Sequence, residues 1–508
     1  MITEVFSAST YGVDAYIIRD ETHIENGLFA FTIVGLPDCA VKESKERVAA
    51  AIKNSMFHFA IRRYTVNLAP ADVKKEGSGF DLPIAIGILC ETSQASPVKV
   101  KDYIFIGELS LDGKLRPVPG ILPIALEAKK NKFKGIILPL ENAKEAAIVE
   151  DIDVMPFETL TEIIDFLNNE ICPQPFKINV KQLFEQDKNY LVDFADVKGQ
   201  AEVKRGMEVA AAGSHNIILI GLPGSGKTML AKRLPTILPP LSLEEALETT
   251  KIHSIAGILQ TGSAIISTRP FRSPHHTASD VSLVGGGPNA KPGEISFAHN
   301  GVLFLDELTE FKKNVLEVMR QPLEDRVVTI SRSKITVQYP CNFMLVAAMN
   351  PTPAGSQKEA SMYSEFDVQK FLSKISGPIL DRIDIHIHVN PVKYHELSSK
   401  AEHEKSEIVR ERVIQAREIQ LYRFKERKGI YSNSNMNSKE IKEFCIIDSD
   451  CENLMKMAIT KLGLSARAYD RILKVSRTVA DLSNEKNIST AHISEAIQYR
   501  SLDRASWM

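Results

Sequence analysis

Residues Gly221–Thr228, which read GLPGSGKT, constrain the fold of this chain more strongly than any other segment. Glycines followed by Lys and Thr at this spacing form a phosphate-binding loop when a buried strand precedes them and a helix follows. Both conditions are met, because the apolar run NIILI comes before the segment and the helical run TMLAKRL continues from its end. The sequence therefore predicts an α/β core with a nucleotide site.

This loop predicts a site for ATP and Mg²⁺. Glycines let backbone N–H groups turn toward phosphate, and the start of the following helix adds the positive end of its dipole. We expect Lys227 to reach the β- and γ-phosphates and the Thr228 hydroxyl to ligate Mg²⁺. The residues expected to hold the nucleotide are Gly221, Leu222, Pro223, Gly224, Ser225, Gly226, Lys227 and Thr228.

Polar side chains end the next two apolar runs of the same region. VLFLDE ends in Asp306 and Glu307, and FMLVAAMN ends in Asn350. Asp306 is expected to hold Mg²⁺ with Thr228, Glu307 to polarise the attacking water, and the Asn350 amide to orient that water. Each pattern alone also fits an ordinary strand end or an Asn-Pro turn, and the preceding phosphate loop favours the catalytic interpretation.

The 508 residues predict a multidomain α/β protein. Residues 1–172 alternate strands and helices, the proline-containing polar segment 173–190 reads as a linker, residues 191–392 form the core with a parallel sheet, and residues 393–508 are helical. The expected strands are residues 64–68, 103–107, 135–138, 216–220, 302–306 and 343–350, and the expected helices of the first domain are residues 41–56 and 122–131.

Composition limits the classes of partner and the location. The net charge of −2 excludes binding of nucleic acid by overall basicity, so any such contact requires a local patch. The six cysteines are scattered without a CxxC pair, as in a reduced protein. The start MITEVFSAST lacks the features of a signal peptide, and the apolar runs are too short for a membrane span. We expect a cytoplasmic protein without a membrane partner.

The order of four further segments is specific: RPFRSPHHTAS, GEISFAHNGVLFLDEL, RQPLEDRVVTISR and KISGPILDRIDIHI. With these motifs the chain resembles, over nearly its whole length, the magnesium-chelatase-like AAA+ ATPases of the YifB/ComM family. The resemblance implies that Asn350 is sensor 1, that Arg382 is an arginine finger directed at a neighbouring subunit's γ-phosphate, and that Arg467 is sensor 2 in a helical lid. Local sequence alone favours a surface ion pair of Arg382 with Asp381 or Asp384.

The same resemblance implies two insertions in the core: a helix-2 insert at about residues 255–298 and a pre-sensor-1 hairpin at about residues 326–340. The hairpin carries Arg332 and Lys334 near its tip, which could follow a DNA backbone in a ring's pore or could form a solvated basic turn. The insert carries the pair His275-His276. No carboxylate or Cys stands at ligand spacing, so a structural or DNA-facing role is favoured over a metal site.

The N-terminal domain resembles the proteolytic domain of Lon, a ribosomal S5 domain 2-like fold, through KKEGSGFDLPIAI and GELSLDGKLRPVPGILPIALEAKK. Such a peptidase uses a Ser nucleophile and a Lys base. The motif places the lysine position on Leu122 and the serine position at or beside Gly79, next to Ser78. Peptidase activity is therefore expected to be lost, although Lys74 and Lys114 remain open as replacements.

The family resemblance implies an ATP-hydrolysing, ring-forming motor that acts on single-stranded or branched DNA. It also implies a hexamer once ATP or DNA is bound. The function expected is that of a branch-migration helicase in recombination or natural transformation. Two alternatives remain. One is a magnesium-chelatase-type ATPase subunit, opposed by the Lon-like domain, and the other is a protein-remodelling AAA+ ATPase or peptidase, opposed by Leu122.

Overall fold

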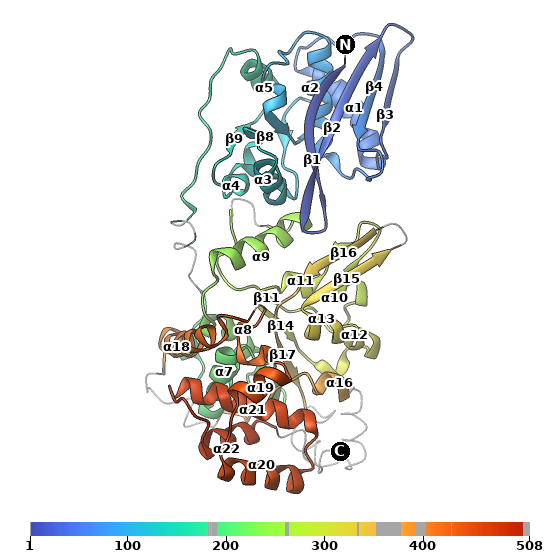
Figure 1. Cartoon of the computed structure of the whole chain (residues 1–508). Coiled ribbons are helices and arrows are strands. Elements are labelled where there is room, and N and C mark those ends of the chain that lie inside the picture. Colours follow the sequence, from blue (N-terminus) through green and yellow to red (C-terminus); the bar gives the residue numbers. More distant parts are fainter. Residues whose placement is uncertain are drawn as a thin grey trace. The chain divides into compact units, whose positions relative to one another are not determined.

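The computed structural model describes residues 2–180, 182, 184, 190–259, 264–332, 335–351, 377–392, 403–427 and 429–500 (Figure 1). The chain forms two compact units. The first contains Met1–Asp187, Leu243–Ser267 and Val337–Tyr339, and the second contains Lys188–Ser242, Thr268–Thr336 and Pro340–Met508. None of the helices in the described ranges has both the length and the apolar character of a membrane span.

The first unit is built on a seven-stranded mixed sheet in the order β3-β4-β2-β1-β5-β8-β9. Its strands are β1 (Thr3–Tyr11), β2 (Asp14–Glu25), β3 (Ala30–Val34), β4 (Arg63–Ala69), β5 (Tyr103–Phe105), β8 (Gly135–Pro139) and β9 (Asp153–Phe157), beside a small pair of β6 (Glu108–Leu109) and β7 (Leu115–Arg116). Its helices are α1 (Cys39–Asn54), α2 (Asp81–Glu91), α3 (Ile121–Lys130), α4 (Ala143–Ala146), α5 (Leu160–Leu167) and α9 (Leu243–Ala256). Helix α2 is buried along nearly its whole length because it packs against β1 and β2 and against α1.

A later segment of the sequence completes this first unit. Helix α9 packs beside α3, where the backbone N–H of Gly120 donates to the Ser254 carbonyl at 3.1 Å. The buried carboxylate of Glu145 accepts hydrogen bonds from the Ser254 hydroxyl at 2.5 Å and from the Leu122 N–H at 2.8 Å. The segment that follows the phosphate loop and its helix thus belongs to a different compact unit from that loop.

The second unit contains a five-stranded sheet in the order β11-β14-β17-β10-β18, and all of its neighbouring strands run parallel. The strands are β10 (Ile217–Ile220), β11 (Phe271–Arg272), β14 (Val302–Leu305), β17 (Met344–Met349) and β18 (Ile385–His388). Strands β10, β14 and β17 are wholly apolar and buried, as expected for a sheet covered on both faces. The parallel α/β core predicted from the sequence is confirmed.

Helices surround this sheet and continue to the end of the described chain. They are α7 (Ala201–Gly213), α8 (Lys227–Ile237), α10 (Asp280–Val284), α11 (Glu294–Phe297), α12 (Lys313–Glu317), α13 (Arg320–Asp325), α16 (Gly377–Leu380), α18 (Ser406–Phe424), α19 (Ser438–Phe444), α20 (Ser449–Leu462), α21 (Ala466–Leu482) and α22 (Thr490–Gln498). Two short sheets pair β12 (Gly285–Gly286) with β13 (Lys291–Pro292) and β15 (Val327–Arg332) with β16 (Ile335–Pro340). Strand β11 lies inside the range predicted as the helix-2 insert, yet it pairs with β14 in the main sheet.

The C-terminal helices share a hydrophobic core with the parallel sheet. Helix α18 packs against α7, α8 and α21 (Figure 1). One apolar cluster includes Val346 of β17, Val413 of α18 and Ile472 of α21. Burial of this shared core holds the C-terminal helices against the helices that cover the parallel sheet. Residues placed on α21 are therefore fixed relative to the sheet.

Candidate nucleotide site

The loop between β10 and α8 has the backbone that close approach of a phosphate requires. Gly226 caps α8 with φ of +94°, a left-handed conformation that favours glycine. Gly221 has no room for a side chain, since a Cβ there would lie 2.4 Å from the carbonyl oxygen of Val389. The loop is also held from outside, because Gln200 Nε2 donates to the Ser225 carbonyl at 2.9 Å. The result is an open turn at the N-terminus of a helix, which suits an anion.

The amine of Lys227 lies at the centre of this turn. Its Nζ donates to the carbonyl oxygens of Gly221 at 2.6 Å and Leu222 at 3.0 Å, and to Asn350 Oδ1 at 3.2 Å. Burial lowers the pKa of this amine from its usual value, and the nearby carboxylates of Asp306 and Glu307 act in the opposite direction. The Lys227 ammonium group therefore joins the loop after β10 to Asn350, which follows β17.

Thr228 and Asp306 lie in direct contact at the same edge of the sheet. The Thr228 hydroxyl donates to Asp306 Oδ2 at 2.7 Å, and Asp306 Oδ1 accepts the backbone N–H of Glu307 at 2.9 Å. A hydroxyl and a carboxylate side by side are oxygen ligands of the kind that Mg²⁺ prefers. The predicted metal ligands thus fit Mg²⁺ in their chemistry.

A histidine from outside the predicted set reaches the predicted water-activating residue. His276 Nδ1 lies 3.0 Å from Glu307 Oε2, and the His276 ring stacks obliquely on that of His275 with centroids 4.1 Å apart. The sequence predicted a structural or DNA-facing role for the pair His275-His276, and no sequence pattern linked the pair to Glu307. The link arises because β11, which precedes the histidines, pairs in the structure with β14, which ends just before Asp306.

The two predicted arginines of the site are engaged within the chain. Arg382 follows α16 and forms an ion pair with Glu324 of α13, while its carbonyl accepts a hydrogen bond from Asn216 Nδ2 at 2.9 Å. Arg467, near the start of α21, donates to Asp381 Oδ2 at 2.5 Å and remains 71 % exposed. Neither of these contacts reaches the phosphate loop.

The residues predicted to face DNA are only partly described. Arg332 is the last residue of β15, and its side chain is exposed. Its Nη2 lies beside Gly286, where a Cβ atom would come within 2.9 Å of it. Lys334 lies outside the described residues. A third histidine, His299, which precedes β14, is buried, and its Nδ1 accepts a hydrogen bond from the backbone N–H of Asn342 at 3.0 Å.

The candidate peptidase residues of the first unit have other partners. The Ser78 hydroxyl contacts Glu108, and Leu122 is fully buried. Lys74 is ion-paired with Glu76 at 2.6 Å and Lys114 with Asp112 at 3.9 Å. Across the described residues, no hydrogen bond joins Ser78 to either lysine, so these residues do not form a Ser-Lys dyad here.

Family models cover both units of the chain. Residues 193–397 match magnesium chelatase, subunit ChlI, and residues 403–500 match the C-terminal part of the same subunit. Residues 21–142 match a further model, described as subunit ChlI of Mg-chelatase. The N-terminal match bears the chelatase name and thus weakens the argument that this domain sets the chain apart from chelatase subunits.

Several proteins are similar in sequence. The competence protein ComM of Haemophilus influenzae is 44% identical over 503 residues, which cover 98% of this chain and 97% of ComM. Protein YifB of Escherichia coli is 41% identical over 506 residues, with the same coverage of both chains. The magnesium-chelatase 67 kDa subunit of Heliobacterium mobile is 25% identical over 221 residues, which cover 38% of this chain and 30% of that subunit.

Proposed function

The chain belongs to the ComM/YifB family of magnesium-chelatase-like proteins, and on this premise we propose that it is an ATP-hydrolysing motor that acts on DNA. The observation that supports ATP hydrolysis is the convergence of Lys227, Thr228, Asp306 and Asn350 at the carboxyl edge of the parallel sheet. Ligands bind at this edge in open α/β sheets. These residues follow three different strands, β10, β14 and β17, so the site depends on the fold as well as on the motif.

Each residue has a proposed task in the transfer of the γ-phosphoryl group to water. Lys227 exchanges its carbonyl partners for phosphate oxygens, and Asn350 orients the attacking water. Glu307 accepts the proton of that water as general base. Mg²⁺, when bound with ATP, would be held by Thr228 and Asp306 and supplies positive charge that neutralises the phosphate oxygens.

A second subunit completes this site in the proposal. Arg382 is ion-paired with Glu324 of its own chain, and we assign its finger role to the site of a neighbouring subunit. Arg467, exposed at the start of α21, acts as the sensor of the C-terminal helices, which form a lid. The assembly proposed is a ring, most simply a hexamer, formed on binding ATP or DNA.

Relationship to ComM supports the DNA part of the proposal. Competence is the state in which a bacterium takes up DNA, and ComM matches this chain over almost its whole length. We propose that the β15-β16 hairpin, with Arg332 and Lys334, contacts DNA and that hydrolysis moves branched DNA during recombination. The first unit is proposed to be a Lon-like domain that no longer cleaves peptides.

An ATPase assay with a panel of DNA structures tests the proposal. We expect single-stranded or forked DNA to stimulate hydrolysis, and a synthetic Holliday junction to be moved with ATP. Lys227→Ala should abolish both activities, whereas Lys232→Ala, an exposed lysine on the same helix, should leave them intact. Hydrolysis that ignores every DNA structure, with no movement of the junction, would contradict the DNA part.

A magnesium-chelatase ATPase subunit is the second candidate, favoured by the names of the matched family models. Against this candidate, the similarity to the Heliobacterium subunit covers only 38% of this chain and 30% of that subunit. A stable complex with a chelatase catalytic subunit in a pull-down would favour this alternative. ATP-dependent casein cleavage that is lost in Ser78→Ala would instead favour a peptidase.

A further inference from the structure

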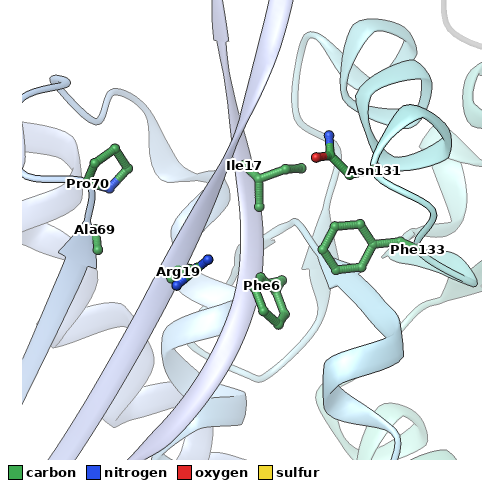
Figure 2. A pocket seen from close by; sticks show the side chains of 7 residues that line it. All are labelled: Phe6, Ile17, Arg19, Ala69, Pro70, Asn131 and Phe133. Atoms are coloured by element: carbon green, nitrogen blue, oxygen red, sulfur yellow. The ribbon is translucent and has the colours of Figure 1, made fainter.

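A pocket of about 480 Å³ opens on the sheet of the first unit (Figure 2). Pockets of this volume are typical of sites for small ligands or single groups of a polymer. Strands β1, β2 and β4 and the segment after α3 supply its lining, which consists of Phe6, Ile17, Arg19, Ala69, Pro70, Asn131 and Phe133.

Strand register explains why these side chains meet. Phe6 pairs with Arg19 across β1 and β2, and Arg19 pairs with Ala69 across β2 and β4, so the three lie on one face of the sheet. The residues next to them along the strands, such as Val5 and Ile18, are fully buried on the other face. The pocket therefore occupies the less covered face of β1, β2 and β4.

Two phenyl rings form the apolar part of the pocket. The rings of Phe6 and Phe133 meet edge to face, with centroids 5.2 Å apart and planes inclined by 62°. Both residues are only partly buried, and Phe133 points from the segment after α3 toward the strands in Figure 2. Rings held in this way offer a surface on which a planar group can stack.

Two exposed cations belong to the segments that supply this pocket. Arg19 lines it, and Lys132 stands in the chain between the lining residues Asn131 and Phe133. Within the described part of the chain, neither the Arg19 side chain nor the Lys132 side chain forms an ion pair or hydrogen bond, whereas the neighbouring Lys129 and Lys130 are ion-paired. These two charges are available to an anionic ligand.

Acidic groups do not oppose those charges inside the pocket. Among the seven residues that line it in the described structure, none is acidic. Glu21, two residues from Arg19 on the same strand, is engaged by Asn67 Nδ2 at 2.7 Å. The seven lining residues therefore carry one positive charge, that of Arg19, and no negative charge.

We propose that this pocket binds a nucleotide unit of single-stranded DNA, with the base on Phe6 and Phe133 and the phosphate at Arg19 and Lys132. Stacking on aromatic rings beside basic side chains is how proteins hold single strands without reading sequence. The Asn131 amide can hydrogen-bond a base edge. A purely apolar ligand would leave the cations unused, and an inorganic anion would leave the rings unused. The choice of DNA rests on the proposed function.

DNA binding by the full-length protein without ATP tests this inference. Fluorescence anisotropy would compare labelled oligo(dT) with an abasic oligonucleotide of equal length and charge. Combined Arg19→Ala and Lys132→Ala should weaken both by about tenfold and reduce the salt dependence. Phe133→Leu should weaken only oligo(dT), which should then bind like the abasic strand. Arg62→Ala, an exposed arginine outside the pocket, is the matched control.

Several outcomes would overturn the inference. The first is unchanged DNA binding by the Arg19 and Lys132 variant, and the second is equal binding of the two oligonucleotides by the unaltered protein. The third is competition by poly-glutamate as strong as that by oligo(dT), which would assign the pocket to an acidic peptide. ATPase stimulation by DNA separates this from the proposed function. If DNA stimulates hydrolysis but the pocket variants bind normally, the pocket inference alone fails. If DNA neither binds nor stimulates, both fail.

Discussion

The carboxylate of Glu307 depends on one histidine for its orientation. Glu307 has a left-handed backbone, with φ of +50°, and a side chain that is 55 % exposed, so packing restricts it little. The contact with His276 Nδ1 at 3.0 Å anchors one of its carboxylate oxygens. In the proposed reaction His276 is thus a positioning residue for the general base.

Replacement of His276 by Ala should lower kcat for ATP hydrolysis by about tenfold, because a base that is misplaced by a fraction of an ångström loses much of its effect. KM and nucleotide affinity should stay unchanged, since His276 contacts no residue of the phosphate loop among its described partners. Steady-state ATPase kinetics and equilibrium nucleotide binding measure the two effects separately.

His275→Ala should lower kcat less than His276→Ala does, because the His275 ring contacts Thr277 and the His276 ring but not Glu307. His276→Asn, which keeps a hydrogen-bond donor, should recover part of the rate. Equal kcat values for the His276→Ala variant and the unaltered protein would show that Glu307 is oriented by other groups.

At the scale of elements, a buried polar network joins β18 to helices α7 and α21. Asp384, which precedes β18 and is 2 % exposed, is ion-paired with Arg471 of α21 and lies 3.0 Å from His215 Nδ1 after α7. His215 Nε2 in turn lies 2.8 Å from Thr478 Oγ1 of α21. Burial alone would raise the pKa of Asp384, but the charges of Arg471 and the hydrogen bond with His215 hold it well below its usual value.

Asp384→Asn should lower the free energy of unfolding by about 3–5 kcal/mol, since it leaves Arg471 partly buried without its counter-ion. Chemical denaturation followed by circular dichroism measures the change. Glu443→Gln is the control: its ion pair with Arg427 is exposed, and the loss should be at most about 1 kcal/mol. Similar losses in both variants would contradict a structural role for the network.

Acidification should destabilise the second unit through its buried histidines. Burial lowers the pKa of both His215 and His386 below the ordinary value of about 6.5. A group with a lowered pKa in the folded state binds fewer protons when folded, so its contribution to stability is full above the unfolded pKa and decreases as pH falls below it. The melting temperature should therefore decrease between pH 7 and pH 5.

His386→Leu removes one of these titrating groups and should make that decrease smaller. His23→Leu, a change at an exposed histidine of the first unit, should leave the pH dependence unchanged. Thermal melts of the three proteins in matched buffers measure it. An unaltered pH dependence in the His386 variant would show that another group dominates acid unfolding.

For the whole molecule, the proposed site is shared between subunits. Arg382 contacts Glu324 within its own chain, and the residues at the phosphate loop are Lys227, Thr228, Asp306 and Asn350. A finger that serves a neighbour makes hydrolysis depend on assembly. Such dependence separates a ring motor from an ATPase that works as a monomer.

Mixing two inactive variants tests this arrangement. Arg382→Ala and Glu307→Gln should each lose hydrolysis by about 10²-fold or more while they still bind ATP. A mixture should recover part of the activity, because some interfaces combine an intact Glu307 with an intact Arg382. ATPase titrations at fixed total protein measure the recovery. Lys227→Ala mixed with Glu307→Gln is the control and should recover nothing, since both defects lie on the same side of the interface.

Sequence patterns predicted the parallel core well because its signals are local. The strand, loop and helix around Gly221–Thr228 lie within about twenty residues, and β14 and β17 are unbroken apolar runs. Strands β1 and β2 were not predicted. They carry polar residues on their buried face, including Ser7, Asp20 and Thr22, which break the alternation expected of a half-buried strand.

Chemistry of the nucleotide loop follows from residue order, because the backbone of a strand, glycine turn and helix is specified by neighbouring residues. Contacts between distant segments do not follow from order. The pairing of His276 with Glu307, the bond of Asp384 to His215 and Arg471, and the addition of α9 to the first unit join residues tens to hundreds apart. Each depends on which faces the folded sheets and helices bring together, and that is decided by burial of a whole core rather than by any local pattern.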